Sequence, residues 1–225
     1  MTATLSDPRA PGELASRWAV FLLRLPGGTQ RCTVSLRDIE ADTAWALRVF
    51  ERMALRPGEP AHLIGAGFDN AILWPYENAL IGLGVPFGVA EPVAIDAPRS
   101  DMFLRRLPMQ AVIGLSGELV DALLALGRDL KTLLGAATVV ALPEAVAALR
   151  QAGLAPWTLL PLGPLWAFEP PDGGGAAYDR NEWQVEAIDG ELRLSTVGPR
   201  ATRFERLALG QRGSVAADGR VVLER

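Results

Sequence analysis

A glycine-rich turn lies between an apolar, strand-like run and the start of a helix in "VFLLRLPGGTQRCTVSLRDIE", residues 20–40. The turn itself is Pro26-Gly27-Gly28-Thr29-Gln30-Arg31. A turn of this kind at a helix N-terminus can hold phosphate, because free amides and the helix dipole favour negative charge. The alternative is a plain strand-to-helix turn, in which glycine and proline serve only the backbone. The local pattern leaves both interpretations open.

A second stretch with chemical potential is "GAGFDNAILWPYEN", residues 65–78, where aromatic side chains stand beside polar ones. Ligand pockets are mainly apolar, with a few polar groups that converge on the ligand. Core packing explains the same aromatic residues equally well. The candidate pocket residues are Phe68, Asp69, Asn70, Trp74 and Tyr76.

Three further residues have reactive side chains, but their surroundings favour structural roles. His62 is the single histidine and stands at the start of an apolar run, which favours a structural histidine over a catalytic base. Cys32 is the single cysteine, and we expect it to be buried and structural. Ser116 lies in "GLSGE", which is typical of a helix cap and lacks the pattern of a nucleophile elbow. No catalytic residue is therefore predicted.

Acidic residues are not dense enough anywhere to predict a metal site. Asp38, Glu40 and Asp42 share a short stretch, but on a helix their side chains point in different directions. We therefore predict that they form a solvated helix face. No metal ligand is predicted.

Composition and charge limit the classes of partner. The chain has 225 residues and a net charge of −4, which argues against nucleic-acid binding. Hydrophobic residues make up 49%, enough for a well-filled core and for a surface that meets a partner. The N-terminal residues lack the pattern of a secretory leader, and no uninterrupted apolar stretch is long enough for a membrane span. A single cysteine excludes an internal disulfide, so we expect a cytoplasmic protein that binds neither nucleic acid nor membrane.

The first two thirds of the chain alternate strand-like and helix-like patterns. Ser35 and Asp38 are spaced as a capping box at the start of a helix, which Pro57-Gly58 ends. The strand-like runs are short and continuously apolar, as in a parallel sheet covered on both faces. Predicted strands are 62–65, 85–89, 111–115, 136–142 and 157–160, and predicted helices are 35–56, 70–84, 100–106, 116–126 and 143–151.

The pattern changes near residue 165. After the loop "PPDGGG" come antiparallel strands at 183–187, 191–196, 203–209 and 221–224, with hairpin signals at Asp189-Gly190 and Asp218-Gly219. We therefore predict an α/β protein with a mainly parallel sheet and flanking helices, followed by an antiparallel β-meander. The predicted division is an N-terminal extension (1–18), an α/β domain (19–165) and a β-rich subdomain packed on it (166–225).

This order of elements resembles the large N-terminal domain of the adenylate-forming enzymes, and most closely the phenylacetate–CoA ligase branch, over about residues 19–223. "NEWQVEAIDGELRLSTVGPRATRFERLALGQRG" resembles the family's Val-Glu-Val strand, Gly-Glu-Leu, Thr-Thr and Pro-Leu-Ile-Arg-Tyr-Arg-Thr-Gly-Asp. "GPLWAFEPPDGGGAAY" resembles the segment after the family's Tyr-Gly-x-Thr-Glu motif. "SLRDIEADTAWALRVFERMALRPGEPAHLIG" resembles the helix and strand after its phosphate loop.

The resemblance implies a nucleotide site whose three motifs are all altered. In the phosphate loop, Gly27, Thr29 and Arg31 match the family's Gly, Thr and Lys, but Pro26 removes an amide donor. Leu25 and Pro26 stand where the family has small hydroxyl residues, and Gln30 stands where it has the following glycine.

The second and third motifs each lose a carboxylate. Trp157 matches the aromatic residue of Tyr-Gly-x-Thr-Glu, but Pro161 stands where the family has glutamate. Gln211 stands where the family's aspartate binds both ribose hydroxyls, and Arg206 matches an arginine of that motif. The vestigial nucleotide site therefore comprises Gly27, Thr29, Arg31, Trp157, Arg206 and Gln211.

The resemblance also implies that the family's mobile C-terminal lid domain, with its catalytic lysine, is missing here. The leading hypothesis is a degenerate relative that binds a small carboxylic acid, an acyl group or a partner protein, without a cofactor and without ATP-driven ligation. The first alternative is an acyl- or aryl-CoA ligase-like enzyme that uses ATP, Mg²⁺ and CoA and takes its lid from another chain. The second is a structural subunit, such as a homodimer.

Overall fold

The computed structural model describes residues 17–25, 27–66 and 70–224. A six-stranded sheet lies at its centre, with strand order β4-β3-β5-β6-β7-β8. The first five strands pair in parallel, and β8 is antiparallel to β7. The strands are β3 (Ala61–Ile64), β4 (Phe87–Ala90), β5 (Ala111–Leu115), β6 (Thr138–Ala141), β7 (Trp157–Leu162) and β8 (Leu165–Glu169).

Helices cover both faces of this sheet, as the continuously apolar strands predict. One face packs against α2 and α3, and Ala111 and Ile113 of β5 point toward these helices. The other face packs against α4 to α7, and Val112 and Leu115 point that way. The helices are α2 (Leu36–Arg52), α3 (Asn70–Gly82), α4 (Ala97–Arg106), α5 (Gly117–Ala125), α6 (Leu130–Leu134) and α7 (Pro143–Gln151), and a 3₁₀ turn, η2 (Ala94–Asp96), precedes α4.

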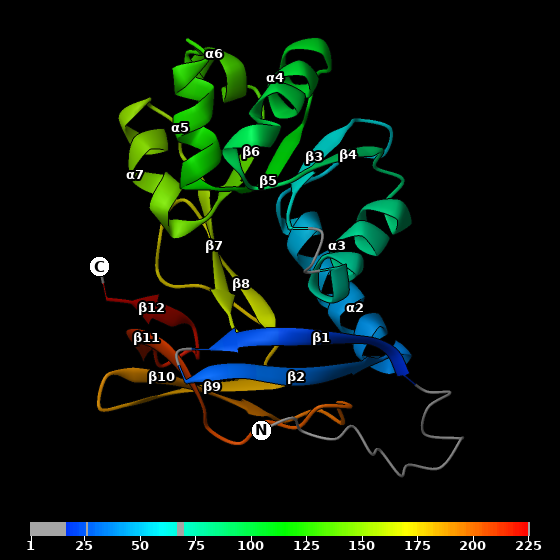
Figure 1. Ribbon diagram of the computed structural model, residues 1–225, viewed down its shortest axis with the longest axis vertical. Coiled ribbons are helices and arrows are strands. Elements are labelled where there is room, and N and C mark those ends of the chain that lie inside the picture. Colours follow the sequence, from blue (N-terminus) through cyan, green and yellow to red (C-terminus); the bar gives the residue numbers. More distant parts are fainter. Residues whose placement is uncertain (1–16, 26, 67–69, 225) are drawn as a thin grey trace, which may run out of the picture.

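Strands from the beginning and the end of the described chain lie together in a second β layer. The four-stranded antiparallel sheet has the order β12-β11-β10-β9, and the hairpin of β1 and β2 lies beside it (Figure 1). Leu23 and Cys32 of the hairpin share a hydrophobic core with Trp183 and Leu194 of the C-terminal sheet. These strands are β1 (Arg17–Leu25), β2 (Gly28–Ser35), β9 (Trp183–Ile188), β10 (Glu191–Thr196), β11 (Leu207–Val215) and β12 (Val221–Leu223).

The predicted fold class is confirmed, with several local corrections. The glycine turn joins two strands, because β2 stands between it and α2; the predicted direct strand-to-helix connection is wrong. The strand predicted at 203–209 lies at Leu207–Val215. Neither α6 nor β8 was predicted, and β8 pairs with β7 in the central sheet although it follows the predicted boundary near residue 165. The division into domains stays a prediction.

The capping box at the start of α2 is confirmed. The Asp38 amide donates to Ser35 Oγ at 3.2 Å, and the Ser35 amide donates to Asp38 Oδ2 at 2.9 Å. Two of the amides that a helix start leaves without partners are thereby satisfied.

Ser35→Ala is expected to lower the free energy of unfolding by about 1 kcal/mol, because the Asp38 amide loses its acceptor. Urea denaturation at constant pH measures the change. Ser214→Ala, at an exposed position of β11, is the matched control and should shift stability by less than about 0.5 kcal/mol. Equal effects of the two changes would show that the capping bond contributes nothing.

Candidate functional site

A cavity of about 270 Å³ lies at the carboxyl ends of the parallel strands, between them and β1. This edge of a parallel sheet is where α/β proteins bind ligands, because strand ends and the loops that follow them converge there. The cavity is lined by Phe21–Arg24, Ile64–Ala66, Ile72, Pro92, Gly114, Leu142, Leu159, Pro161, Gly163 and Trp166.

Close approach of β5 to β3 shapes one wall of this cavity. Gly114 has a φ of +91°, and a Cβ atom there would lie 2.1 Å from the carbonyl oxygen of Ile64. The strand register shifts between Ile113 and Leu115, so Gly114 marks an irregularity in the pairing of β5 with β6. Only glycine fits this position without backbone movement.

The lining chemistry suits an apolar ligand that carries an acid group. Apolar side chains make up most of the wall, and Arg24 is the one charged residue among the described residues that line it. Arg24 is exposed on β1, at the solvent side of the cavity. A guanidinium can bind a carboxylate through two parallel hydrogen bonds.

Gln211 is the predicted nucleotide residue that the structure brings next to the cavity. Its Nε2 donates to the carbonyl oxygen of Pro161 at 3.1 Å, and Pro161 lines the cavity. Its Oε1 is buried and has no hydrogen-bond partner in the described part of the chain. Two positions that the resemblance assigns to separate motifs therefore meet through β7 and β11.

The remaining predicted nucleotide residues are spread over the molecule. Gly27, Thr29 and Arg31 are exposed on the hairpin, where Thr29 pairs with Arg24 across the strands. Trp157 is half-buried at the start of β7. Arg206 is exposed, and its Nε lies 3.7 Å from Glu186. Their nucleotide-binding roles stay predictions.

The predicted pocket residues divide among different surroundings. Phe68 and Asp69 lie outside the described residues, and Asn70 is described only as the first residue of α3. Trp74 is 40% exposed, and its ring centroid lies 5.4 Å from that of Trp18. Tyr76 is buried in the core, with its ring centroid 4.6 Å from that of Trp166 and its pKa raised by burial. Neither Trp74 nor Tyr76 lines the cavity at the strand ends.

The predicted solvated face of Asp38 and Asp42 is wrong, because both carboxylates belong to a partly buried ionic cluster. Arg200 binds Asp42 through two hydrogen bonds of 2.6 and 2.8 Å, and its Nε lies 4.0 Å from Asp38. Its Nη1 also lies 3.5 Å from the carboxylate of Glu182. Glu182 forms a second ion pair, with Arg37. We define the ionic cluster as Arg37, Asp38, Asp42, Glu182 and Arg200.

The ionic cluster connects α2 to the loop between β10 and β11. The Ala201 amide donates to Asp38 at 3.2 Å, and the Arg200 guanidinium lies 4.3 Å from the centroid of the Trp183 ring. Burial raises the pKa of Asp42, although the Arg200 bonds act in the opposite direction. The cluster therefore joins the two halves of the fold. The sequence could not pair residues 158 positions apart, such as Asp42 and Arg200.

His62 is fully buried, as its place in an apolar run predicts. Its Nδ1 lies 3.2 Å from the Gly88 carbonyl oxygen and therefore donates to it. Its Nε2 lies 3.0 Å from Ser100 Oγ and accepts the hydroxyl proton. Ser100 is also fully buried, so no substrate reaches this pair. The predicted buried state of Cys32 and the helix cap at Ser116 are confirmed as well.

Stability is expected to fall as the pH drops below about 6.5, because burial lowers the pKa of His62 below its ordinary value. In that range the unfolded chain takes up a proton before the folded chain does. The loss between pH 7 and 5.5 should reach up to about 1 kcal/mol. Urea denaturation at several pH values measures it, and His62→Gln should remove this part of the slope. An unchanged slope in the variant would contradict the assignment.

A wider groove of about 720 Å³ separates α7 from β12. Thr158 and Leu160 line it, whereas Leu159 and Pro161 line the cavity, so the two lie on opposite faces of β7. Among the described residues, the groove is lined by one guanidinium, Arg150, and by three carboxylates, so its negative charges outnumber its positive one and disfavour an acid ligand; the carboxylates are Glu144, Glu169 and Glu224. The smaller cavity is therefore the better candidate for an acid.

In residues 17–25, 27–66 and 70–224, no three or more His, Cys, Asp or Glu side chains are grouped so that they could hold a metal ion. Across the same part of the chain, no helix combines the length and the apolar character that crossing a bilayer requires.

Several solved structures with the same fold are CoA ligases. 2-Hydroxyisobutyryl-CoA ligase, in complex with 2-HIB-AMP and CoA, matches with a TM-score of 0.72 and 12% identity over 93% of this chain and 56% of that one. The anthranilate CoA ligase AuaEII, in complex with anthranoyl-AMP, matches with a TM-score of 0.63 and 15% identity over 91% and 46%. A putative long-chain-fatty-acid CoA ligase from Rhodopseudomonas palustris matches with a TM-score of 0.62 and 12% identity over 100% and 62%.

The chain spans about half the length of these ligases. No protein-family model and no curated protein matches its sequence. At 12–15% identity the likeness concerns the fold. Both the parallel sheet with its flanking helices and the antiparallel sheet beside it agree with that likeness. The chain therefore has the fold of the N-terminal domain of the adenylate-forming enzymes.

Proposed function

We propose that this protein binds a small carboxylic acid or acyl group in the cavity at the strand ends, and that it does not activate the acid with ATP. The observation that supports this most is the apolar cavity of about 270 Å³ with Arg24 at its solvent side. Its apolar wall suits an aryl or short alkyl body, and the guanidinium suits the carboxylate. We propose further that the chain is a degenerate form of the phenylacetate–CoA ligase branch.

The altered motifs support binding without ligation. Transfer of an adenylyl group depends on several groups that hold the nucleotide and its charge in place at once. At the ribose position Gln211 offers one acceptor oxygen and no charge, and its amide nitrogen is already bonded to Pro161. Pro26 removes an amide donor from the turn that would surround the phosphates.

Thermal unfolding with a panel of aryl and alkyl acids tests the proposal. Acids that fit should raise the melting temperature, since a ligand at 100 times its Kd adds about 2.7 kcal/mol of stability. ATP with Mg²⁺ should leave it unchanged. Arg24→Gln should weaken the response to acids, and Arg206→Gln, at an exposed position outside the cavity, should not.

The outcomes separate the proposal from its alternatives. Acid-dependent exchange of pyrophosphate into ATP, with or without an added lid domain, would show a working ligase and contradict the proposal. A stable oligomer that responds to no acid would identify a structural subunit. Sedimentation of the ligand-free chain distinguishes that case.

A further inference from the structure

The outer edge of the hairpin strand β1 has no paired strand among the described residues, and an apolar row lies beside this edge. Within the described residues, β1 pairs only with β2, and no backbone hydrogen bond joins β1 to any segment outside the hairpin. Its nine residues extend about 30 Å. Along one face Trp18, Val20 and Leu22 are 37%, 48% and 66% exposed, although the residues between them point toward the core.

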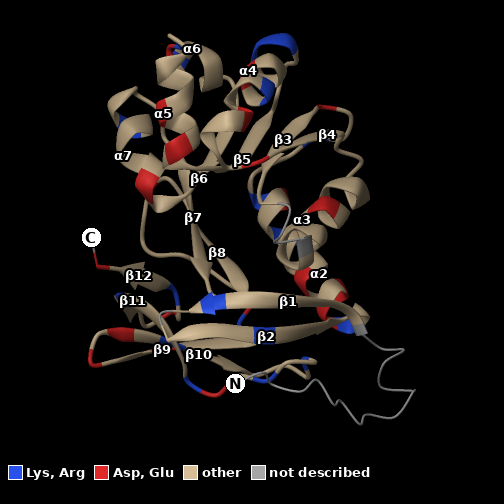
Figure 2. Cartoon of the chain, viewed as in Figure 1, with Lys and Arg blue, Asp and Glu red and all other residues tan. Residues whose placement is uncertain are grey.

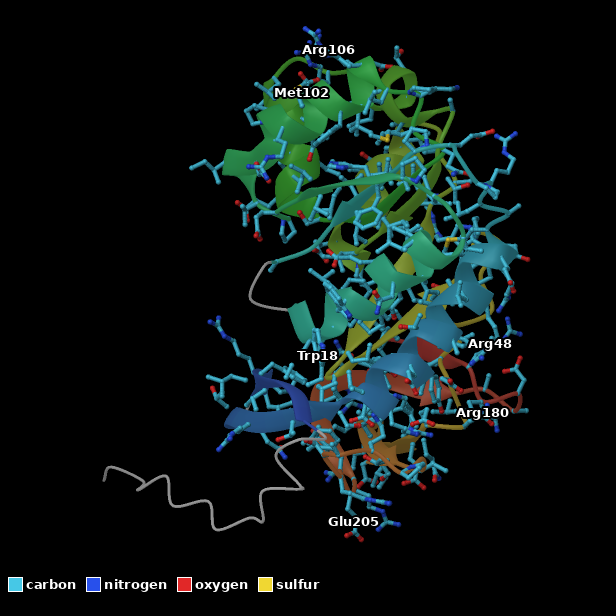
Figure 3. The ribbon with its side chains drawn as sticks, turned by 90° about the vertical axis from the view of Figure 1, so that its right-hand side faces the viewer. Trp18, Arg48, Met102, Arg106, Arg180 and Glu205 are labelled. Carbon is cyan, nitrogen blue, oxygen red and sulfur yellow. The ribbon has the colours of Figure 1, made fainter. Side chains whose placement is uncertain are left out.

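An aromatic pair extends this apolar row toward α3. Trp18 lies between the hairpin and α3 (Figure 3), and its ring centroid is 5.4 Å from that of Trp74. Natural proteins usually cover or charge such an edge, because it offers unpaired backbone groups to another strand. We define the β1 surface as Trp18, Val20, Leu22, Trp74 and the free edge of β1.

The charged residues of the hairpin itself are all basic. Residues 17–35 contain Arg17, Arg24 and Arg31 and no acidic residue, in a chain whose net charge is −4. Basic residues stand on both hairpin strands in Figure 2. Arg31 pairs with Leu22 across the strands and is exposed, so it adjoins the apolar row directly.

We propose that the β1 surface binds an extended segment of a partner protein, which adds to β1 as a strand and carries apolar and acidic residues on one face. Added strands gain affinity from main-chain hydrogen bonds and specificity from alternate side chains. Apolar side chains of the partner would cover Trp18, Val20 and Leu22, and its carboxylates would meet Arg24 and Arg31.

Other occupants fit the same observations less well. A second copy of the hairpin would bring like-charged arginines together, which destabilises strand pairs. A lipid surface would leave the edge amides and carbonyls of β1 without partners, and each such group costs several kcal/mol in hydrocarbon. A partner strand satisfies both the backbone groups and the charge.

Peptide binding by the full chain tests the proposal. The probe is a labelled ten-residue peptide that has threonine at every second position. The other five positions are, in order, Val, Val, Val, Glu and Glu. The peptide is made with this sequence and with its reverse, and binding is measured by fluorescence polarisation. Replacing the glutamates with lysines should weaken binding about tenfold. Successive amides of a strand point to opposite edges, so only every second amide of the peptide can face β1. Methylating the amide nitrogens that face β1 should abolish binding, and methylating the other set should not.

Matched variants locate the binding surface. Val20→Thr should weaken peptide binding severalfold, whereas Val222→Thr, at a valine 40% exposed on β12, should not. Val20 does not line the cavity, so acid binding should survive this change. A failure of acid binding and a failure of peptide binding are therefore distinguishable results. Equal binding by both methylated peptides, or no binding by any peptide, would overturn the proposal.

Three further results would also overturn it, because each identifies a different occupant. The first is dimerisation that Val20→Thr abolishes. The second is cosedimentation with phosphatidylglycerol vesicles without any peptide binding. The third is peptide binding only after residues 1–16 are removed, which would identify the chain's own N-terminal segment.

Discussion

Replacing Arg200 with methionine is expected to lower the free energy of unfolding by about 3–5 kcal/mol. Arg200 is buried and makes two hydrogen bonds to Asp42, and it lies near Asp38 and Glu182. Without the guanidinium these carboxylates remain largely removed from water, which is unfavourable, and they lose the ion pairs and hydrogen bonds that offset it. The cation–π contact with Trp183 is lost as well. The melting temperature should fall by roughly 6–20 °C.

The control for this prediction is an exposed ion pair. Arg206→Met removes a pair with Glu186 in which the Arg206 side chain is 65% exposed, and it should cost less than about 1 kcal/mol. Asp42→Asn combined with Arg200→Met should be less harmful than the sum of the single changes, because the pair is coupled. Urea denaturation of the unmodified chain, Asp42→Asn, Arg200→Met and the double variant measures this coupling. Equal losses for Arg200→Met and Arg206→Met would contradict the role of the ionic cluster.

Gly114→Ala is expected to have an effect of comparable size, a loss of about 2–6 kcal/mol in the free energy of unfolding. The φ of +91° strains any residue with a Cβ, which costs about 1–3 kcal/mol. The added carbon would also lie 2.1 Å from the Ile64 carbonyl oxygen, so the backbone of β3 or β5 must move. Overpacking of this kind costs a further 1–3 kcal/mol.

Gly127→Ala separates strain from the clash. Gly127 has a similar φ of +73°, but an added Cβ there meets no atom within 4 Å. Its substitution should cost the strain alone, at least about 1 kcal/mol less than Gly114→Ala. Because Gly114 lines the cavity, Gly114→Ala should also weaken acid binding, and Gly127→Ala should not. Indistinguishable stabilities would show that β3 and β5 do not depend on close approach at this point.

Features coded by neighbouring residues could be predicted from the sequence. The capping box at Ser35 and Asp38 depends on residues three positions apart, and the buried strand at Ala111–Leu115 depends on an uninterrupted apolar run. The turn at Asp189-Gly190 follows from residues that tolerate positive φ, and their φ values are 53° and 77°. Each of these signals is complete within a few residues.

Features that depend on distant partners could not be predicted. Strand β2 exists because Cys32 and Val34 bury their side chains against other segments, and the local pattern of glycine, polar and apolar residues resembles a turn before a helix. Asp42 looks solvated until Arg200 is placed beside it. The sequence carries no signal for Arg24 at the cavity, because its place there depends on how the hairpin packs.

The central claim is that the cavity at the strand ends holds a carboxylic acid. The most direct test is a calorimetric titration of the best acid from the panel into three chains. Ala66→Leu fills the cavity with three more carbon atoms, and Ala125→Leu makes the same change at an exposed position of α5. We predict saturable binding to the unmodified chain and to Ala125→Leu, and at least tenfold weaker binding to Ala66→Leu. Equal binding to all three chains would contradict the account.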